Sequence, residues 1–120
     1  MDCKILFSGN TENIKNFLKQ FPDTVDVPGL PGNYTPLIYA CSKNDYEKCK
    51  LLIDAGADVN KFDDNGRTAL HYATFNINTN MIKILLEKNA LPMFDIFGKT
   101  PFIYSLELND AEVIRLNRGN

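Results

Sequence analysis

The chain has 120 residues, of which 44% are hydrophobic and 23% are charged, a composition typical of one globular domain and not of a disordered tail. Its formal net charge of −2 argues against a nucleic-acid-binding protein, and its lysines and arginines form no basic run that would suit a membrane surface. No apolar stretch of about 18 residues is present to cross a bilayer, and the N-terminus turns polar too early for a secretory signal.

Residues 2–22 are predicted to form a degenerate first pair of helices. Segment 9–18 matches segment 44–53 in its pattern of polar and apolar residues. Residues 23–34, rich in proline and glycine, are expected to be a loop and a variant hairpin. Three polar residues suit a solvated outer face of the first pair: Lys15, Asn16 and Lys19.

Three similar segments follow: Thr35–Ala40 (TPLIYA), Thr68–Ala73 (TALHYA) and Thr100–Ser105 (TPFIYS). They start 33 and 32 positions apart, and a second apolar helical pattern follows each one. Threonine is a good N-cap, and a proline after it suits the first helical position. The residues two positions before the threonines tolerate a left-handed backbone: Asn33, Gly66 and Gly98.

Between these segments the sequence carries turn signals. Gly56 and Asn89 are predicted to end the second helices in a left-handed conformation. The run Asp63-Asp64-Asn65-Gly66 predicts a projecting turn; it resembles part of a calcium loop but lacks the closing glutamate. One residue is missing between Ala90 and Leu91 relative to the preceding repeat, so we expect the hairpin that follows to be distorted.

The recurring pattern resembles the ankyrin repeat, whose signature is T-P-L-H-x-A, a turn, V-K-L-L-L and then G-A-D-V-N at a period of about 33 residues. The resemblance covers almost the whole chain. It implies an all-α fold, an α-solenoid with β-hairpin turns, that holds about three full or near-full repeats plus degenerate caps. We expect one domain over residues 1–120, with 1–32 as the N-terminal cap repeat, 33–65 and 66–97 as repeats, and 98–120 as a short C-terminal cap repeat.

The candidates for chemistry are few. His71 is the one histidine, and the resemblance implies structural hydrogen bonds for it near a hairpin base. Cys3, Cys41 and Cys49 have no CxxC spacing, so we expect neither a disulfide framework nor a zinc site, and we expect Cys41 and Cys49 to be buried, reduced thiols of a cytoplasmic protein. No nucleophile or phosphate-loop motif is present, so we predict no enzyme activity, cofactor or metal.

By the same resemblance, a protein partner binds at the hairpin tips and the concave side of the first helices. The repeat pattern leaves several aromatic and charged residues unassigned there. The candidate partner-binding residues are Tyr34, Phe62, Asp64, Asn65, Arg67, Phe75, Asn76, Phe94, Ile96, Phe97, Lys99 and Leu108.

Two alternatives stay open at these positions. Phe94, Ile96 and Phe97 either contact a partner, close the shortened hairpin, or face a further repeat. The row formed by Tyr39, Tyr72 and Tyr104 either packs between first helices or offers hydroxyls to a partner.

The function expected from the resemblance is a non-catalytic protein-interaction module, monomeric or weakly dimeric, that binds neither nucleic acid nor membrane. The chain has 14 Asn and 10 Ile, which suggests an AT-rich genome and a viral or bacterial effector that engages a host protein in the host cytosol. The alternatives are an inhibitor that neutralises a toxin or enzyme, a self-assembling fragment of a longer repeat array, and a small-molecule site in the groove.

Overall fold

The computed structural model describes residues 3–118, and over that range the chain forms eight α-helices and one 3-10 turn. Residues 1, 2, 119 and 120, which belong to the expected cap repeats, lie outside the described residues. The elements are α1 (Ile5–Ser8), α2 (Thr11–Gln20), η1 (Pro22–Thr24), α3 (Pro36–Ser42), α4 (Tyr46–Asp54), α5 (Ala69–Phe75), α6 (Thr79–Glu87), α7 (Pro101–Leu108) and α8 (Ala111–Asn117).

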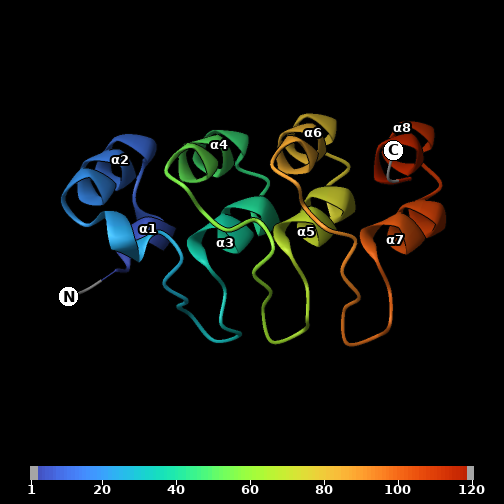
Figure 1. Ribbon diagram of the computed structural model, residues 1–120, viewed down its shortest axis with the longest axis horizontal. Coiled ribbons are helices and arrows are strands. Elements are labelled where there is room, and N and C mark those ends of the chain that lie inside the picture. Colours follow the sequence, from blue (N-terminus) through green and yellow to red (C-terminus); the bar gives the residue numbers. More distant parts are fainter. Residues whose placement is uncertain (1–2, 119–120) are drawn as a thin grey trace.

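The helices lie in two layers, as Figure 1 shows. The first helix of each pair (α1, α3, α5, α7) packs on the first helix of the next pair, and the second helices (α2, α4, α6, α8) form the other row. Three loops project from the side of the first helices, and together the layers make an elongated stack of 41 × 25 × 20 Å. The expected all-α repeat stack is confirmed.

The first helices begin where the repeat pattern predicts. The Thr35 hydroxyl accepts a hydrogen bond from the Ile38 N–H at 3.2 Å, and the Thr100 hydroxyl accepts one from the Ile103 N–H at 3.3 Å. A proline follows each of these two threonines at the first helical position, where its missing N–H removes no helical hydrogen bond. The threonines are therefore N-caps, as their spacing indicated.

Residues with positive φ end the helices and shape the turns. Gly56 (φ 94°) and Asn89 (φ 66°) follow the second helices, as predicted. Asn33, Gly66 and Gly98 are also left-handed, with φ between 56° and 74°. The loops inside the helix pairs use a further position for the same purpose: Asn44, Ile77 and Asn109.

One continuous core runs along the stack between the two layers. Its members come from all four helix pairs, so no pair buries its apolar face alone. Cys41 and Cys49 belong to it as free, buried thiols whose sulfur atoms lie 3.4 Å apart. Burial raises the pKa of the Cys41 thiol, which keeps it protonated.

The projecting loops are hairpins in path but hold no regular strand within residues 3–118. A single antiparallel bridge joins Gly29 and Tyr34. The β-hairpin turns of the expected fold are thus short turns held by a few backbone hydrogen bonds and by side chains.

Candidate functional site

The second and third hairpins have the same hydrogen bonds. In the second, the Asp63 N–H donates to the Arg67 carbonyl at 3.0 Å and the Gly66 N–H donates to the Asp63 carbonyl at 2.9 Å. In the third, the Asp95 N–H donates to the Lys99 carbonyl and the Gly98 N–H donates to the Asp95 carbonyl, at 3.0 and 2.9 Å. The prediction that the third hairpin is distorted is therefore wrong for its turn, which has the same hydrogen bonds as the turn of the second hairpin.

The missing residue is accommodated before the turn, in residues 90–94. There the Met93 N–H donates to the Leu91 carbonyl at 2.9 Å, and the Leu91 N–H donates to the Asn60 side chain at 2.8 Å. Because the missing residue lies before the turn, the turn keeps the hydrogen bonds of the preceding hairpin.

A buried aspartate organises each of these two turns. The Asp63 carboxylate accepts from the backbone N–H groups of Asn65 and Arg67, at 2.9 and 3.0 Å. The Asp95 carboxylate accepts from the N–H groups of Phe97 and Lys99 at the same distances. A side chain that satisfies two backbone donors takes the place of the missing strand ladder.

The tyrosine row is structural. The Tyr72 hydroxyl donates to Asp63 and the Tyr104 hydroxyl donates to Asp95, so neither is free for a partner. Burial and the Asp63 carboxylate raise the pKa of Tyr72 well above its usual value, which keeps this hydroxyl a donor. The Tyr39 ring instead packs edge-on against Phe7, with the ring centroids 5.7 Å apart.

His71 joins the second repeat to the third hairpin. Its Nδ1 accepts from the Thr68 N–H at 3.1 Å, and its Nε2–H donates to the Lys99 carbonyl at 3.0 Å. The structural role predicted for this histidine is confirmed. Burial lowers its pKa from the ordinary 6.5, so the fold favours the neutral ring.

This lowered pKa predicts a pH dependence of stability. The unfolded chain binds the proton more tightly, so the His71 contribution is complete above the ordinary pKa and is lost as the pH falls below it. We expect the free energy of unfolding, measured by urea denaturation, to be lower at about pH 5 than at about pH 7. His71→Ile, which places the residue of Ile38 and Ile103 at this position, should flatten that slope. An unchanged slope in this variant would contradict the assignment.

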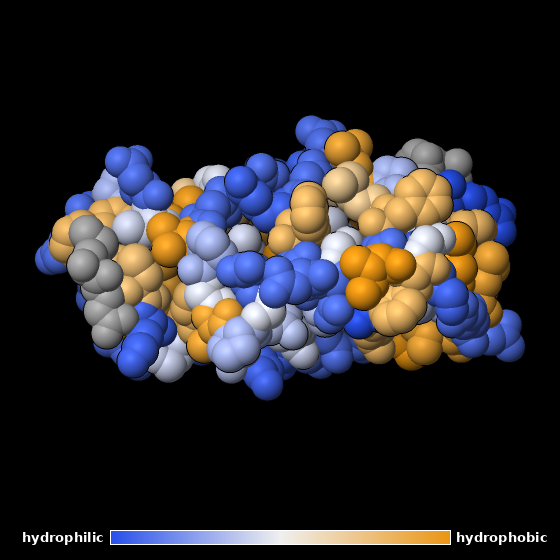
Figure 2. Space-filling model, turned by 90° about the horizontal axis from the view of Figure 1, so that it is seen from below, coloured by the Kyte–Doolittle hydropathy of each residue, from blue (hydrophilic) through white to orange (hydrophobic). Residues whose placement is uncertain are grey.

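Four of the predicted partner-binding residues are large, apolar and exposed, and they lie in the second and third projecting loops. Phe62, Phe94, Ile96 and Phe97 have 60% to 68% of their surface exposed, so they do not fold back to close the third hairpin. Figure 2, which looks onto this side, shows apolar side chains in the C-terminal half and also at the N-terminal end, with mostly polar ones across the middle. We call these four residues the hairpin patch.

Arg67 lies at the centre of this region and connects the two hairpins. Its Nε is 3.3 Å from the Asp95 carboxylate, and its other end donates to the Tyr104 hydroxyl at 3.2 Å. The guanidinium also lies over the rings of Phe75 and Phe97, at 5.0 and 5.5 Å from their centroids. The sequence marked Arg67 as a contact residue, but its main partners lie within the fold.

Phe75 is half-buried. Its ring packs edge-on against Tyr104, with centroids 4.7 Å apart, and against Tyr72 at 5.8 Å. It packs against these two tyrosines of the first helices and presents only part of its ring. Two of the predicted partner-binding residues, Phe75 and Arg67, therefore make contacts within the fold that stabilise it.

The remaining predicted residues differ in exposure and in their partners. Asp64 is exposed and accepts from the Asn33 side chain at 2.9 Å, and Lys99 pairs with Glu107 at 2.7 Å. Asn76 holds the Cys41 carbonyl at 2.8 Å through its side-chain nitrogen. Asn65 and Leu108 are exposed, and Tyr34 is half-buried.

Sequence reasoning overlooked four large apolar residues that are also exposed: Leu30, Ile77, Leu91 and Leu106. The missing residue before Leu91 could have indicated its exposure, because the side chain of Leu91 in this shortened segment is exposed to solvent. For Leu106 the signal was the repeat register, because the equivalent residues Cys41 and Thr74 are smaller or more polar.

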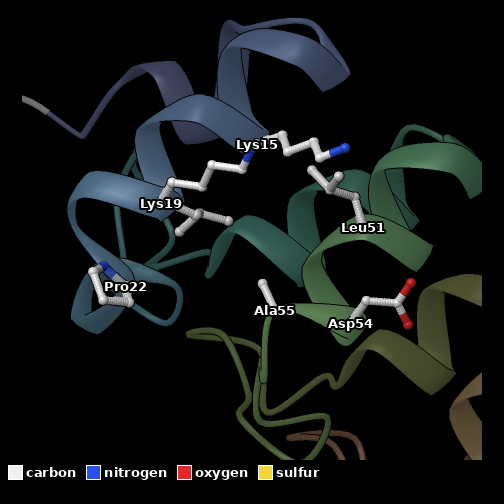
Figure 3. A pocket seen from close by; sticks show the side chains of 7 residues that line it. Lys15, Lys19, Pro22, Leu51, Asp54 and Ala55 are labelled. Atoms are coloured by element: carbon white, nitrogen blue, oxygen red, sulfur yellow. The ribbon is translucent and has the colours of Figure 1, made fainter.

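A separate groove of about 460 Å³ lies between α2 and α4, away from the hairpins (Figure 3). Leu18, Leu51, Pro22 and Ala55 supply apolar surface, and the charged residues Lys15, Lys19 and Asp54 complete its lining. None of the predicted partner-binding residues lines it.

Residues 3–118 lack the features of two other kinds of site. No cluster of three or more His, Cys, Asp or Glu side chains suited to a metal ion occurs there. No helix in that range combines the length and the apolar character needed to span a membrane.

Comparison with known proteins identifies relatives. A family model described as ankyrin repeats (3 copies) matches residues 3–94 and 61–116. Interferon antagonists OPG039 of Monkeypox virus and OPG040 of Vaccinia virus (strain Western Reserve) are each 36% identical over 92 residues, 73% of this chain and 32% of the relative. Putative ankyrin repeat protein L271 of Acanthamoeba polyphaga mimivirus is 32% identical over 117 residues, 89% of this chain and 16% of the relative. The chain thus spans less than a third of the length of these relatives.

Proposed function

Because the chain belongs to the ankyrin-repeat family, we propose that it binds a partner protein through the hairpin patch. The observation that carries this proposal is the exposure of Phe62, Phe94, Ile96 and Phe97 on turns whose backbone is held by buried aspartates. Large apolar side chains gathered on one surface are typical of protein-binding sites.

Rigidity makes these side chains suitable anchors. Burying one phenylalanine contributes roughly 1.5–3 kcal/mol, and a pre-formed turn avoids part of the entropy cost of binding. The Asp95–Arg67 contact holds the second hairpin against the third. Asp64, Asn65 and Lys99 are polar residues of the same two hairpins, and a polar margin beside an apolar centre is the usual anatomy of an interface.

The viral relatives support a host protein as the partner. Two of them are named interferon antagonists of poxviruses, and a third comes from a giant virus. We therefore propose that the chain acts as a viral effector in the host cytosol, and that a host protein of the interferon response is the first partner to test.

Affinity capture from host-cell lysate tests the proposal, with captured proteins identified by mass spectrometry. The test variant carries Phe62→Ser, Phe94→Ser and Ile96→Ser, and leaves the structural residues Arg67 and Phe75 intact. The matched control is Ile77→Ser, an exposed apolar residue in the loop between α5 and α6.

We expect the test variant to bind its partner at least about tenfold more weakly, since about 1.4 kcal/mol corresponds to tenfold in affinity and three anchors are removed. The control should bind as the wild type does. Equal capture by the test variant and the wild type would place the interface elsewhere. The identity of a protein lost specifically with the test variant would separate an effector from an inhibitor of a toxin or enzyme.

A further inference from the structure

The groove between α2 and α4 combines apolar side chains with a basic side. Leu18 is a buried residue of α2, and Leu51 and Ala55 line the groove from α4. Lys15 and Lys19 line it from α2, and both are exposed (Figure 3). The groove lies in the layer of second helices, whereas the hairpin patch lies on loops that project from the first helices (Figure 1).

The two lysines depart from the charge pattern of the other second helices. In α4 and α6 a lysine near the middle of the helix is followed, one turn later, by an acidic residue. In α4 the Lys50 Nζ lies 3.4 Å from the Asp54 carboxylate. Counted from the N-cap of each helix, the equivalent pairs are Lys15 with Lys19 in α2, Lys50 with Asp54 in α4, and Lys83 with Glu87 in α6.

The positive charge of Lys15 and Lys19 is not balanced within the fold. Like charges one turn apart repel each other and destabilise a helix. None of the ion pairs among residues 3–118 includes either lysine, and Asp54 across the groove is already paired with Lys50. Lys19 lies in the last turn of α2, where the helix dipole favours a cation, but this reason does not extend to Lys15.

The shape of the groove suits a polypeptide better than a small molecule. Its volume of about 460 Å³ continues into a second hollow of about 270 Å³, which shares Leu51 and Asp54 and reaches Thr11, Glu47 and Lys50. A small ligand binds best in a pocket that encloses most of its surface. A long hollow that follows two helices is instead typical of sites that hold an amphipathic helix.

We propose that this groove binds an acidic amphipathic helix of a partner protein. Its apolar side chains would lie against Leu51 and Ala55, and its carboxylates would face Lys15 and Lys19. Side chains one helical turn apart are separated by roughly 5–6 Å, so carboxylates at that spacing match the two lysines. Charge complementarity selects an acidic partner and excludes a basic one. This docking surface is separate from the hairpin patch.

The test uses two synthetic helical peptides and the isotope-labelled chain. The acidic peptide consists of alanine, leucine and glutamate, with its glutamates one turn apart beside its leucines, and the second peptide replaces every glutamate by lysine. We expect the acidic peptide to shift the NMR signals of Lys15, Lys19, Leu51 and Ala55 in a saturable way. The shifts should weaken with added salt, and the lysine peptide should not produce them.

Lys15→Glu is the test variant, because it separates binding from stability. A glutamate one turn before Lys19 forms a favourable pair within α2, so the melting temperature should stay the same or rise. Binding of the acidic peptide should nevertheless weaken by at least about tenfold, since an attractive charge becomes a repulsive one. Lys83→Glu is the matched control, with the same change of charge at the equivalent exposed position of α6, and it should bind as the wild type does.

Four results would each overturn the proposal. They are equal binding of the two peptides, an unchanged affinity in Lys15→Glu, no saturable shifts at the groove, and saturable binding of sodium octanoate there in place of the acidic peptide, which would indicate a small-molecule site. The variant with Phe62→Ser, Phe94→Ser and Ile96→Ser should bind the acidic peptide as the wild type does. This proposal and the proposed function can therefore fail independently.

Discussion

Asp95→Ala is expected to lower the free energy of unfolding by about 3 kcal/mol, because it removes a buried carboxylate that accepts hydrogen bonds from four donors. The side chain of Asp95 is completely buried. Its carboxylate accepts hydrogen bonds from two backbone N–H groups, from the Tyr104 hydroxyl and from Arg67. Alanine leaves all four donors without this acceptor. Urea denaturation followed by circular dichroism measures the loss.

Asp64→Ala is the matched control for this prediction. Asp64 is an aspartate of the neighbouring hairpin, but it is exposed, and its carboxylate accepts a hydrogen bond from the Asn33 side chain at 2.9 Å. Its removal should cost well under about 1 kcal/mol, as surface hydrogen bonds usually do. Equal losses for Asp95→Ala and Asp64→Ala would show that the buried aspartate does not organise the hairpins.

The stabilisation that Asp95 provides also depends on pH. Burial alone would raise the pKa of Asp95, but the hydrogen bonds from Tyr104, the Lys99 and Phe97 backbone, and Arg67 together lower it below the ordinary 3.8. Its contribution is therefore complete above the ordinary pKa and is lost as the pH falls through the lower, folded-state pKa. This loss occurs in more acidic solution than the loss that comes from His71.

Leu18→Ala is the other substitution with a large expected effect, a loss of about 2–5 kcal/mol from a cavity in the core. Leu18 is a buried residue of α2, which packs on α4. A stack of four helix pairs has few interfaces between repeats, so weakening one should lower the melting temperature of most of the domain.

Leu108→Ala controls for the chemistry of this substitution, because it removes the same atoms from an exposed position. It should change stability by no more than about 0.5 kcal/mol. A melting temperature unchanged by Leu18→Ala would contradict the assignment of the first helix pair as an integral cap of the stack.

The hydrogen bonds around Asp63 and Asp95 divide the residues of the hairpins into two groups, one structural and one available for binding. The buried aspartates, tyrosine hydroxyls and Arg67 are used to hold the turns, which leaves the hairpin patch to contact a partner. Substitutions of the buried aspartates, of the tyrosines bonded to them or of Arg67 are expected to reduce binding through loss of structure. Substitutions in the hairpin patch are expected to reduce binding while the fold stays intact.

The sequence by itself determined the features that depend on neighbouring residues along the chain. The threonine caps, the prolines after them and the left-handed Gly66 and Gly98 follow from local backbone sterics and hydrogen bonding, and the structure contains all of them. Repetition of these signals near a 33-residue period was enough to predict the all-α stack.

Tertiary structure decided how each side chain is used. Arg67 and Phe62 both occupied positions that the repeat pattern left unassigned, yet Arg67 binds Asp95 of the next hairpin while Phe62 remains exposed. The same holds for Leu106, which lies where Cys41 and Thr74 are buried. In a stack, exposure depends on whether another repeat lies alongside, and a pattern within one repeat does not contain that information.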